Sequence, residues 1–438
     1  MRPSRAAETA LALLLAGLAA LTPLVTGCGS RLPERAFETR PTVHPSGGEP
    51  LRVGVITSAT SPVGGDALTG PRDGALAYFA ALNARGGLDG RRIEVLTCDD
   101  GGSGVGNNAC VHRLVDERKV FALVATTALD YAGAPRVSAA GVPDIGGQPL
   151  TPAYETYPHL YGIYGSSAPR TGAAPGWHGV LYGGTEVYRW FRTHLGARTA
   201  AVVSYNQAAS AAYARLVADG LRKEGYRVVD EQVDFVLPNF RAVAADLRAQ
   251  RVDVVFDAMD SHGNARLCEA MQASGVRVAA KVTNVQNWNA AVPRDYARAP
   301  GCRAALYATG SSRSYDDTSV PAVREFRAAM ERRGQRTLSQ WQLEGWAAAM
   351  WFTDAARSCL GTQGRGPTRA CVERYLDRAE PYTARGLLLP VRFEHLAEPP
   401  EFRHTCLSVA RWRDGRGWVA QGDMNRNCAT VPQLGYRP

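Results

Sequence analysis

The stretch LNARGGLDGRRIEVLTCDD, residues 82–100, indicates how the chain is built. Its first residues end an amphipathic run, and Gly86-Gly87 stops that run because glycine readily adopts the left-handed conformation that follows a helix. Asp89-Gly90 predicts a tight turn, and RRIEVLTC (91–98) has the apolar content of a strand. We therefore expect the second half of a β-α-β unit, in which the glycines serve backbone geometry rather than phosphate binding.

The same alternation of short apolar runs and longer amphipathic runs continues along the chain. LRVGVIT (51–57) has the continuous apolar character of a buried strand, and residues 71–84 place their apolar side chains on one helical face. Further strands are predicted at 120–126, 142–147, 199–205, 226–233, 252–260, 279–283 and 303–309. Strands separated by helical runs predict an α/β fold in which parallel sheets carry helices on both faces.

Length and composition agree with a globular protein of two lobes. A chain of 438 residues is too long for one compact core, and 45% hydrophobic with 21% charged residues is typical of folded rather than disordered chains. The net charge of +9 comes largely from arginines that are scattered singly. Because a nucleic-acid groove needs clustered basic and aromatic residues, we predict no nucleic-acid partner. Residues 343–356 predict a buried helix, and 407–421 a hairpin around Asp414-Gly415.

The N-terminus has the features of an export signal. Arg2 and Arg5 precede the apolar run TALALLLAGLAALTPLV, and small residues follow it. A membrane-spanning helix is the alternative, but Pro23 and the short apolar length weigh against it. Val25-Thr26-Gly27-Cys28 resembles the bacterial lipobox, which implies cleavage after residue 27 and acylation of Cys28. Residues 28–50 are polar and rich in proline and glycine, so they are expected to form a tether at the membrane surface.

Cysteine usage also indicates an exported protein. Of the nine cysteines, Cys28 belongs to the lipobox and an even number remains. No CxxC pair occurs and histidine is scarce, so we predict no metal site. In an oxidising compartment disulfides are the default, and we expect each cysteine to pair with its nearest neighbour in sequence. The predicted pairs are Cys98–Cys110, Cys268–Cys302, Cys359–Cys371 and Cys406–Cys428.

No catalytic motif is present. The sequence contains no GxSxG elbow, HExxH, P-loop or GxGxxG after a strand, so we predict no catalytic residue, no enzymatic activity and no cofactor. The glycine-rich segment 101–108 lies between two cysteines that are expected to be bridged. Asp257 and Asp260 follow a predicted strand, where open α/β sheets bind ligands. A ligand contact is one interpretation of these aspartates, and helix capping by Asp260 is the other.

Four segments together resemble a known family. LRVGVIT, GPRDGALAYFAALNARGGLDGRRIEVLTCDD, VFALVATTA and AAGVPDIGG are similar to the type I periplasmic binding proteins of the branched-chain amino acid class. The resemblance covers about residues 51–420. It implies a lobe of residues 51–165 plus 303–385 and a lobe of 166–302 plus 386–438, joined by three hinge strands. It also implies capture of a small solute between the lobes and delivery to an ABC permease with its ATPase subunits, by a monomer anchored outside the cell membrane.

The family's ligand contacts can be placed on this sequence one by one. The strand-final hydroxyl cluster of the first lobe matches Thr126 and Thr127, and the next contact of the family falls near Gln148. In the second lobe the matching positions are Tyr205, Asp257 and Gln286.

One departure concerns the charge of the solute. The family's acidic residue, which pairs with the ammonium group of an amino acid, falls at Gln286–Asn287, where this chain is neutral. Burying an ammonium group without a carboxylate is costly. Asp130, Asp257 or Asp260 could supply the charge instead, so a polar or amide-like solute and an amino acid in a different pose both stay open.

Two other functions are compatible with an exported α/β protein. The same fold could report a solute to a membrane signalling partner, which the sequence does not separate from transport. A lipid-anchored secreted hydrolase would need a nucleophile and a base in one motif, and the sequence contains no such pair.

Overall fold

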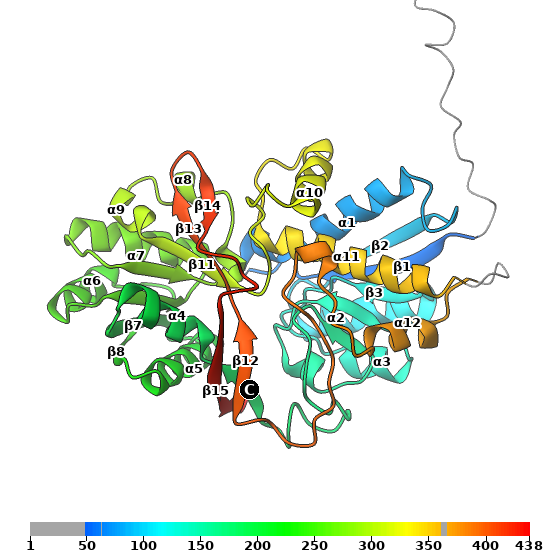
Figure 1. Cartoon of the computed structure of the whole chain (residues 1–438), viewed down its shortest axis with the longest axis horizontal. Coiled ribbons are helices and arrows are strands. Elements are labelled where there is room, and N and C mark those ends of the chain that lie inside the picture. Colours follow the sequence, from blue (N-terminus) through cyan, green and yellow to red (C-terminus); the bar gives the residue numbers. More distant parts are fainter. Residues whose placement is uncertain (1–48, 63, 361–365) are drawn as a thin grey trace, which may run out of the picture. The chain divides into compact units, whose positions relative to one another are not determined.

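A computed structural model describes residues 49–62, 64–360 and 366–438 (Figure 1). The predicted signal segment 1–27, Cys28 and almost all of the predicted tether 28–50 lie outside the described residues. The predicted α/β class is confirmed, because two parallel sheets are flanked by helices. A third, antiparallel sheet was not predicted.

The first sheet is fully parallel, with strand order β2-β1-β3-β4-β5. Val53 and Val124 belong to the apolar cluster that includes helices α1 and α11, whereas Ile56 and Leu123 belong to the cluster on α2 and α3. Both faces are thus covered, which explains the continuous apolar strands. The elements of this part are β1 (Leu51–Thr57), α1 (Gly70–Asn83), β2 (Ile93–Asp99), α2 (Gly104–Val111), β3 (Ala122–Val124), α3 (Ala134–Ala139), β4 (Asp144–Gly147), β5 (Leu160–Gly162) and α11 (Gln340–Ser358).

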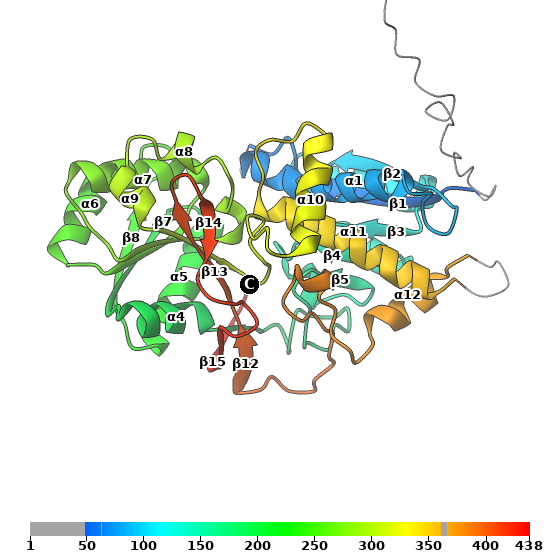
Figure 2. The same ribbon diagram turned by 45° about the horizontal axis from the view of Figure 1, so that its top comes forward.

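Helices α1 and α11 approach each other so closely that glycine is required on both. A Cβ added at Gly74 would lie 1.8 Å from the carbonyl oxygen of Gln342, and one at Gly345 would lie 2.0 Å from that of Pro71. The two backbones are therefore in direct contact (Figure 2). Tyr78 and Trp346 pack edge to face beside this contact, with ring centroids 4.9 Å apart.

The second sheet has the order β14-β13-β11-β10-β9-β7-β8. Strands β7 to β11 are parallel, and the predicted hairpin adds β13 antiparallel to β11 and β14 antiparallel to β13. Sheet pairing thus places β11 in this sheet, beyond the expected lobe boundary at residue 303. The elements are α4 (Glu186–Leu195), β7 (Thr199–Tyr205), α5 (Ala208–Lys223), β8 (Arg227–Val233), α6 (Phe240–Ala249), β9 (Val254–Ala258), α7 (Ser261–Ala273), β10 (Ala280–Thr283), β11 (Leu306–Gly310), β13 (Ser408–Arg413) and β14 (Gly417–Ala420).

The third sheet joins segments that are far apart in sequence. Strand β15 (Cys428–Tyr436) pairs with β12 (Phe402–Cys406) on one side (Figure 1). On its other side it pairs with β6 (Leu181–Gly184). The remaining helical elements are η2 (Gly65–Thr69), η3 (His112–Glu117), η4 (Pro152–Glu155), η5 (Val285–Asn287), α8 (Val292–Asp295), α9 (Pro300–Ala304), α10 (Pro321–Arg332), α12 (Arg369–Leu376) and η6 (Ala384–Gly386).

The segment 82–100 folds as expected. Gly86 and Gly87 have φ values of 98° and 76°, and Gly90 has a φ of 81°. Asn83, the last residue of α1, exchanges two side-chain hydrogen bonds of 2.9 Å with the backbone N–H and carbonyl of Ile93 at the start of β2. These bonds fix the distance between helix and strand across the turn.

The structure contains the four disulfides that nearest-neighbour pairing predicted. They close loops with sequence separations of 12, 34, 12 and 22 residues. In the chain-entropy view each restricts the unfolded state, and a short loop contributes up to roughly 3 kcal/mol.

Candidate functional site

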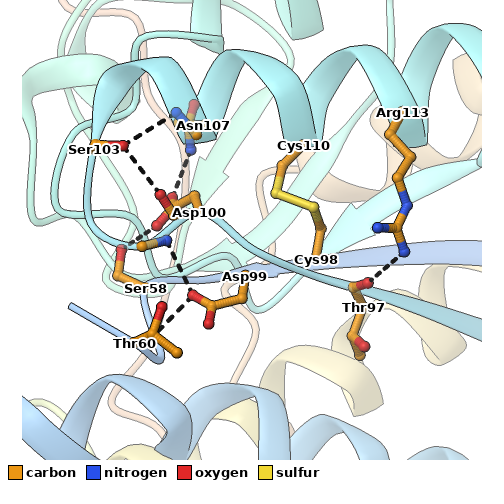
Figure 3. Close-up of a disulfide and its surroundings, with 12 residues drawn as sticks. Ser58, Thr60, Thr97, Cys98, Asp99, Asp100, Ser103, Asn107, Cys110 and Arg113 are labelled. Atoms are coloured by element: carbon orange, nitrogen blue, oxygen red, sulfur yellow. Dashed lines mark hydrogen bonds between the residues drawn. A yellow bond between two sulfur atoms is a disulfide. The ribbon is translucent and has the colours of Figure 1, made fainter.

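The carboxyl edge of the first sheet is held together by the side chain of Asp100 (Figure 3). Its Oδ1 accepts hydrogen bonds from Ser58 Oγ at 2.7 Å and from the N–H of Gly102 at 2.8 Å, and its Oδ2 accepts from Asn107 Nδ2 at 2.9 Å. Ser58 Oγ in turn accepts from the N–H of Leu129 at 3.1 Å. Because the Cys98–Cys110 disulfide fixes α2 beside β2, the loops after β1, β2 and β3 form one connected edge.

The two predicted threonine contacts differ in their surroundings. Thr126 Oγ1 donates to Asp144 Oδ1 at 3.0 Å, and Asp144 Oδ2 accepts from Tyr131 and Tyr154 at 2.6 and 2.8 Å. Burial raises the pKa of Asp144, while these three hydroxyl groups lower it. Thr126 is thus part of an internal network. Thr127 is also fully buried, and its Oγ1 donates to the Ala125 carbonyl at 3.3 Å.

Gln148 lies in a second buried network, around Glu344 of α11. Its Nε2 donates to Glu344 Oε2 at 2.8 Å, and Tyr164 donates to the same oxygen at 3.0 Å. Ser312 donates to Glu344 Oε1 at 2.6 Å. Burial raises the pKa of Glu344 to about 7, although the three hydrogen bonds act in the opposite direction. Gln148 therefore links the loop after β4 to residues that follow β5 and β11.

Asp257 in the second sheet is fully engaged with its neighbours. It forms an ion pair with Lys281, and both side chains are completely buried. Asn264 completes the cluster, since its Nδ2 donates to Asp257 Oδ1 at 2.8 Å and its Oδ1 accepts from Lys281 Nζ at 2.6 Å. Sequence reasoning missed Lys281 and Asn264, because a lysine inside an apolar strand gives no sign of its partner.

Tyr205 is the last residue of β7, and Gln286 lies in η5, which follows β10 at the carboxyl edge of the second sheet. The hydroxyl of Tyr205 points to Asp260 at 3.4 Å, and Asp260 caps α7 by accepting from the N–H of Gly263 at 2.7 Å. The capping alternative for Asp260 is thus confirmed. Gln286 lies in η5 beside the loop after β1, since a Cβ on Gly64 would be 3.3 Å from Gln286 Nε2.

A cavity of about 210 Å³ lies at the ends of β9, β10 and β11, where parallel sheets bind ligands. The strand ends contribute Phe256, Asp257 and Thr283, and α4 and α5 supply the opposite wall. Asp257 is the one predicted site residue among those that line this cavity. The remaining lining residues are Glu186, Val187, Tyr188, Tyr213, Val217, Val282, Asn284, Val285, Thr309, Gly310, Ser311 and Leu407.

Most of this lining was not predicted from the sequence. Thr283 ends a predicted strand, and the position at a strand end could have marked it as a candidate ligand contact. Glu186, Tyr188 and Tyr213 lie on amphipathic helices without any distinctive motif, so the sequence offers no signal for them. A second cavity, of about 170 Å³, is lined among others by Glu155, Trp177 and Arg403. None of the six predicted contacts lines it.

The sequence profile of the periplasmic binding proteins matches residues 50–416. The chain belongs to this family. No curated protein matches the sequence. The family consists of binding proteins that act outside the cytoplasm, in agreement with the resemblance seen in the segments from 51 onward.

Solved structures share the fold of this periplasmic binding protein at low identity. A substrate-binding protein of an ABC transporter from Aeropyrum pernix has a TM-score of 0.65 at 15% identity, covering 88% of this chain and 97% of that one. The solute-binding protein of R. palustris in complex with benzoate has a TM-score of 0.62 at 15% identity, with coverages of 88% and 97%. The branched-chain amino acid transporter protein of Streptococcus pneumoniae in complex with isoleucine has a TM-score of 0.61 at 14% identity, with coverages of 88% and 100%.

Two further observations concern membranes and metals. Within residues 49–62, 64–360 and 366–438 of this periplasmic binding protein, no helix has the length and apolar character needed to cross a bilayer. In the same residues one group, His404 with Cys406 and Cys428, has the spacing of metal ligands. Its two sulfur atoms are joined in a disulfide, so they are not free thiolates for a metal.

Proposed function

We propose that the chain is an extracytoplasmic, lipid-anchored solute-binding protein that captures a small polar solute and delivers it to an ABC permease and its ATPase subunits. The observation that carries the proposal is the 210 Å³ cavity at the strand ends of the second sheet, in a chain that matches the binding-protein family over residues 50–416. Its size suits a small solute, since pockets for drug-sized ligands are larger, about 300–1,000 Å³.

The solute is held between two lobes in this proposal. The expected first lobe is residues 51–165 plus 303–385, and the expected second lobe is 166–302 plus 386–438. We assign β11, which falls within 303–385, to the second lobe because it pairs with β10 there. Gln286 of the second lobe lies beside Gly64 in the loop after β1 of the first. This proximity supports an approach of the two lobes at the strand ends that border the cavity.

The fold leaves the class of solute open, since related folds hold isoleucine in one protein and benzoate in another. For this chain we propose an amino acid or a related amide or carboxylate. Cys28 carries the lipid, residues 28–50 act as the tether, and the protein works as a monomer beside its permease.

A thermal-shift screen of the secreted chain against amino acids, amides and small carboxylates tests the binding function. At least one compound should raise the unfolding temperature in a concentration-dependent way, because its binding stabilises the folded state by RT ln(1 + [L]/Kd). No stabilisation by any compound would contradict the proposal. Uptake of the identified solute should be lost when the gene is deleted, whereas unchanged uptake with a lost cellular response would show a sensor instead.

Labelling with a radioactive fatty acid tests the anchor. Labelled protein should be found in the membrane fraction, and Cys28→Ala should release an unlabelled chain. Cys28 is the appropriate target because the other eight cysteines are bonded in disulfides. A Cys28→Ala chain that still incorporates the label would exclude this anchor.

A further inference from the structure

The cavity at the ends of β9 to β11 has an aromatic wall. Tyr188 comes from the first turn of α4, Tyr213 from the first half of α5 and Phe256 from β9. The rings of Tyr188 and Phe256 meet edge to face with centroids 5.4 Å apart. Aromatic faces carry partial negative charge and therefore attract cations as well as apolar groups.

The charges of the cavity are of one sign. Among its described lining residues there is no lysine, arginine or histidine, and Glu186 and Asp257 are the two acids. Asp257 is neutralised by Lys281 and Asn264. Glu186 has no ion pair within the described residues, and its Oε2 is buried without a hydrogen-bond partner.

Burial and the neighbouring charges shift the pKa of Glu186 in both directions. Burial, the largest effect, raises the pKa of Glu186, and the Glu224 carboxylate raises it further. The hydrogen bond from its own backbone N–H and the charge of the Arg403 guanidinium lower the pKa. Glu224 is itself paired with Arg189 at 2.9 Å and bonded by Thr185. Arg403 forms no ion pair with Glu186 among the described residues, so a cation bound against the carboxylate would reduce the remaining cost of its burial.

A further buried polar atom without a partner belongs to a residue that lines the cavity. Thr283 lines the cavity at the end of β10, is only 2% exposed, and its Oγ1 has no hydrogen-bond partner among the described residues. A hydroxyl oxygen accepts hydrogen bonds from an N–H group. Thr283 and Glu186 together thus offer acceptors to a ligand that carries several donors on one nitrogen.

We propose that this cavity binds a small organic ammonium ion, whose N–H groups donate to Glu186 and Thr283 and whose carbon body lies against Tyr188, Tyr213 and Phe256. This inference rests on the proposed solute-binding function and names the class of solute. A neutral solute would leave Glu186 without a paired cation. An anionic solute would face Glu186 with no cation in the lining to offset the repulsion.

Titration calorimetry on the intact chain with three compounds that share one ring tests the charge directly. Benzylamine is cationic, benzyl alcohol neutral and benzoate anionic. We expect benzylamine to bind at least tenfold more tightly than the other two, and Glu186→Gln to remove that preference. Glu94→Gln is the matched control, because Glu94 is an exposed residue of β2 that pairs with Arg52, and it should bind benzylamine like the natural chain.

Two additional measurements distinguish a loss of benzylamine binding from a loss of folding. Tyr213→Ala removes a half-exposed ring from the wall and should weaken benzylamine binding about fivefold at unchanged unfolding temperature. Between pH 5 and 7 the affinity for benzylamine should rise with pH in the natural chain, because binding requires an ionised Glu186. It should be constant in Glu186→Gln.

Binding of benzoate or benzyl alcohol as tight as that of benzylamine, or benzylamine binding that survives Glu186→Gln, would overturn the ammonium inference and leave the solute-binding function intact. The inference would also fail if none of the three compounds bound while the solute screen identified another ligand. If neither the three compounds nor the screen gave any binding, the proposed function itself would be wrong.

Discussion

Replacing Lys281 by methionine tests whether Asp257 belongs to the core or to the binding surface. The substitution keeps the length of the side chain and removes the cation that pairs with Asp257 at a site where both side chains are completely buried. Asp257 would then keep the bond from Asn264 Nδ2 at 2.8 Å as its main compensation. Removing one partner of a buried ion pair costs roughly 3–5 kcal/mol, because the other charge stays buried without compensation.

Urea unfolding followed by tryptophan fluorescence measures this cost. At a denaturant dependence of about 3 kcal/mol per molar urea, the midpoint of Lys281→Met should fall by about 1 to 1.7 M. The double variant Asp257→Asn with Lys281→Met should lose about 1–3 kcal/mol less than the sum of the two single variants. Glu94→Gln, at an ion pair whose side chains are 51% and 44% exposed, is the control and should cost less than about 1 kcal/mol.

The outcome decides the role of Asp257. A loss below about 1 kcal/mol for Lys281→Met, or full additivity in the double variant, would refute the view that the ion pair holds this part of the sheet. Solute affinity that falls in Asp257→Asn without any loss of stability would instead show direct contact with the solute.

Three further predictions follow from particular contacts. Gly345→Ala should destabilise the protein by at least about 2 kcal/mol in urea unfolding, because its Cβ would lie 2.0 Å from the Pro71 carbonyl oxygen; an unchanged midpoint would mean that the helices move apart freely. Replacing Cys98 and Cys110 together by serine should lower the unfolding free energy by up to roughly 3 kcal/mol. Dithiothreitol should cause no further destabilisation through this loop, because the variant has no disulfide there to reduce. Glu344 has a folded-state pKa of about 7, above its usual 4.5, so its contribution is complete below pH 4.5 and is lost as the pH rises through 7. Unfolding free energies should therefore decrease by about 3 kcal/mol over that range, and Glu344→Gln should flatten the profile; an unchanged slope would exclude Glu344 as its source.

Local sequence signals predicted the elements of the sheets well, and the reason lies within each segment. The glycines after α1 require positive φ, the continuous apolar runs require burial on both faces, and the Asp414-Gly415 turn lies between two strand-like arms. The disulfides follow the same logic, because cysteines close in sequence meet first when the chain collapses. Family membership was also recognisable, since it depends on the order of such local patterns.

Partners that come from distant segments could not be read from the sequence. Gln148 and Glu344 are 196 positions apart, Asp257 and Lys281 belong to different strands, and β6 pairs with the end of the chain through β15. The hydroxyl of Thr126 donates to Asp144, which no spacing rule connects to it, and its contact with a solute stays a prediction.

The amino-acid sequence by itself indicated the α/β class, most strands of the two parallel sheets and the cysteine pairs, because periodicity, turn residues and short loops act within a few residues. Only the tertiary structure decided which carboxylates have partners. Burial and hydrogen bonding depend on which strand ends and helices come together, so the difference between the paired Asp257 and the unpaired Glu186 exists only in the folded chain.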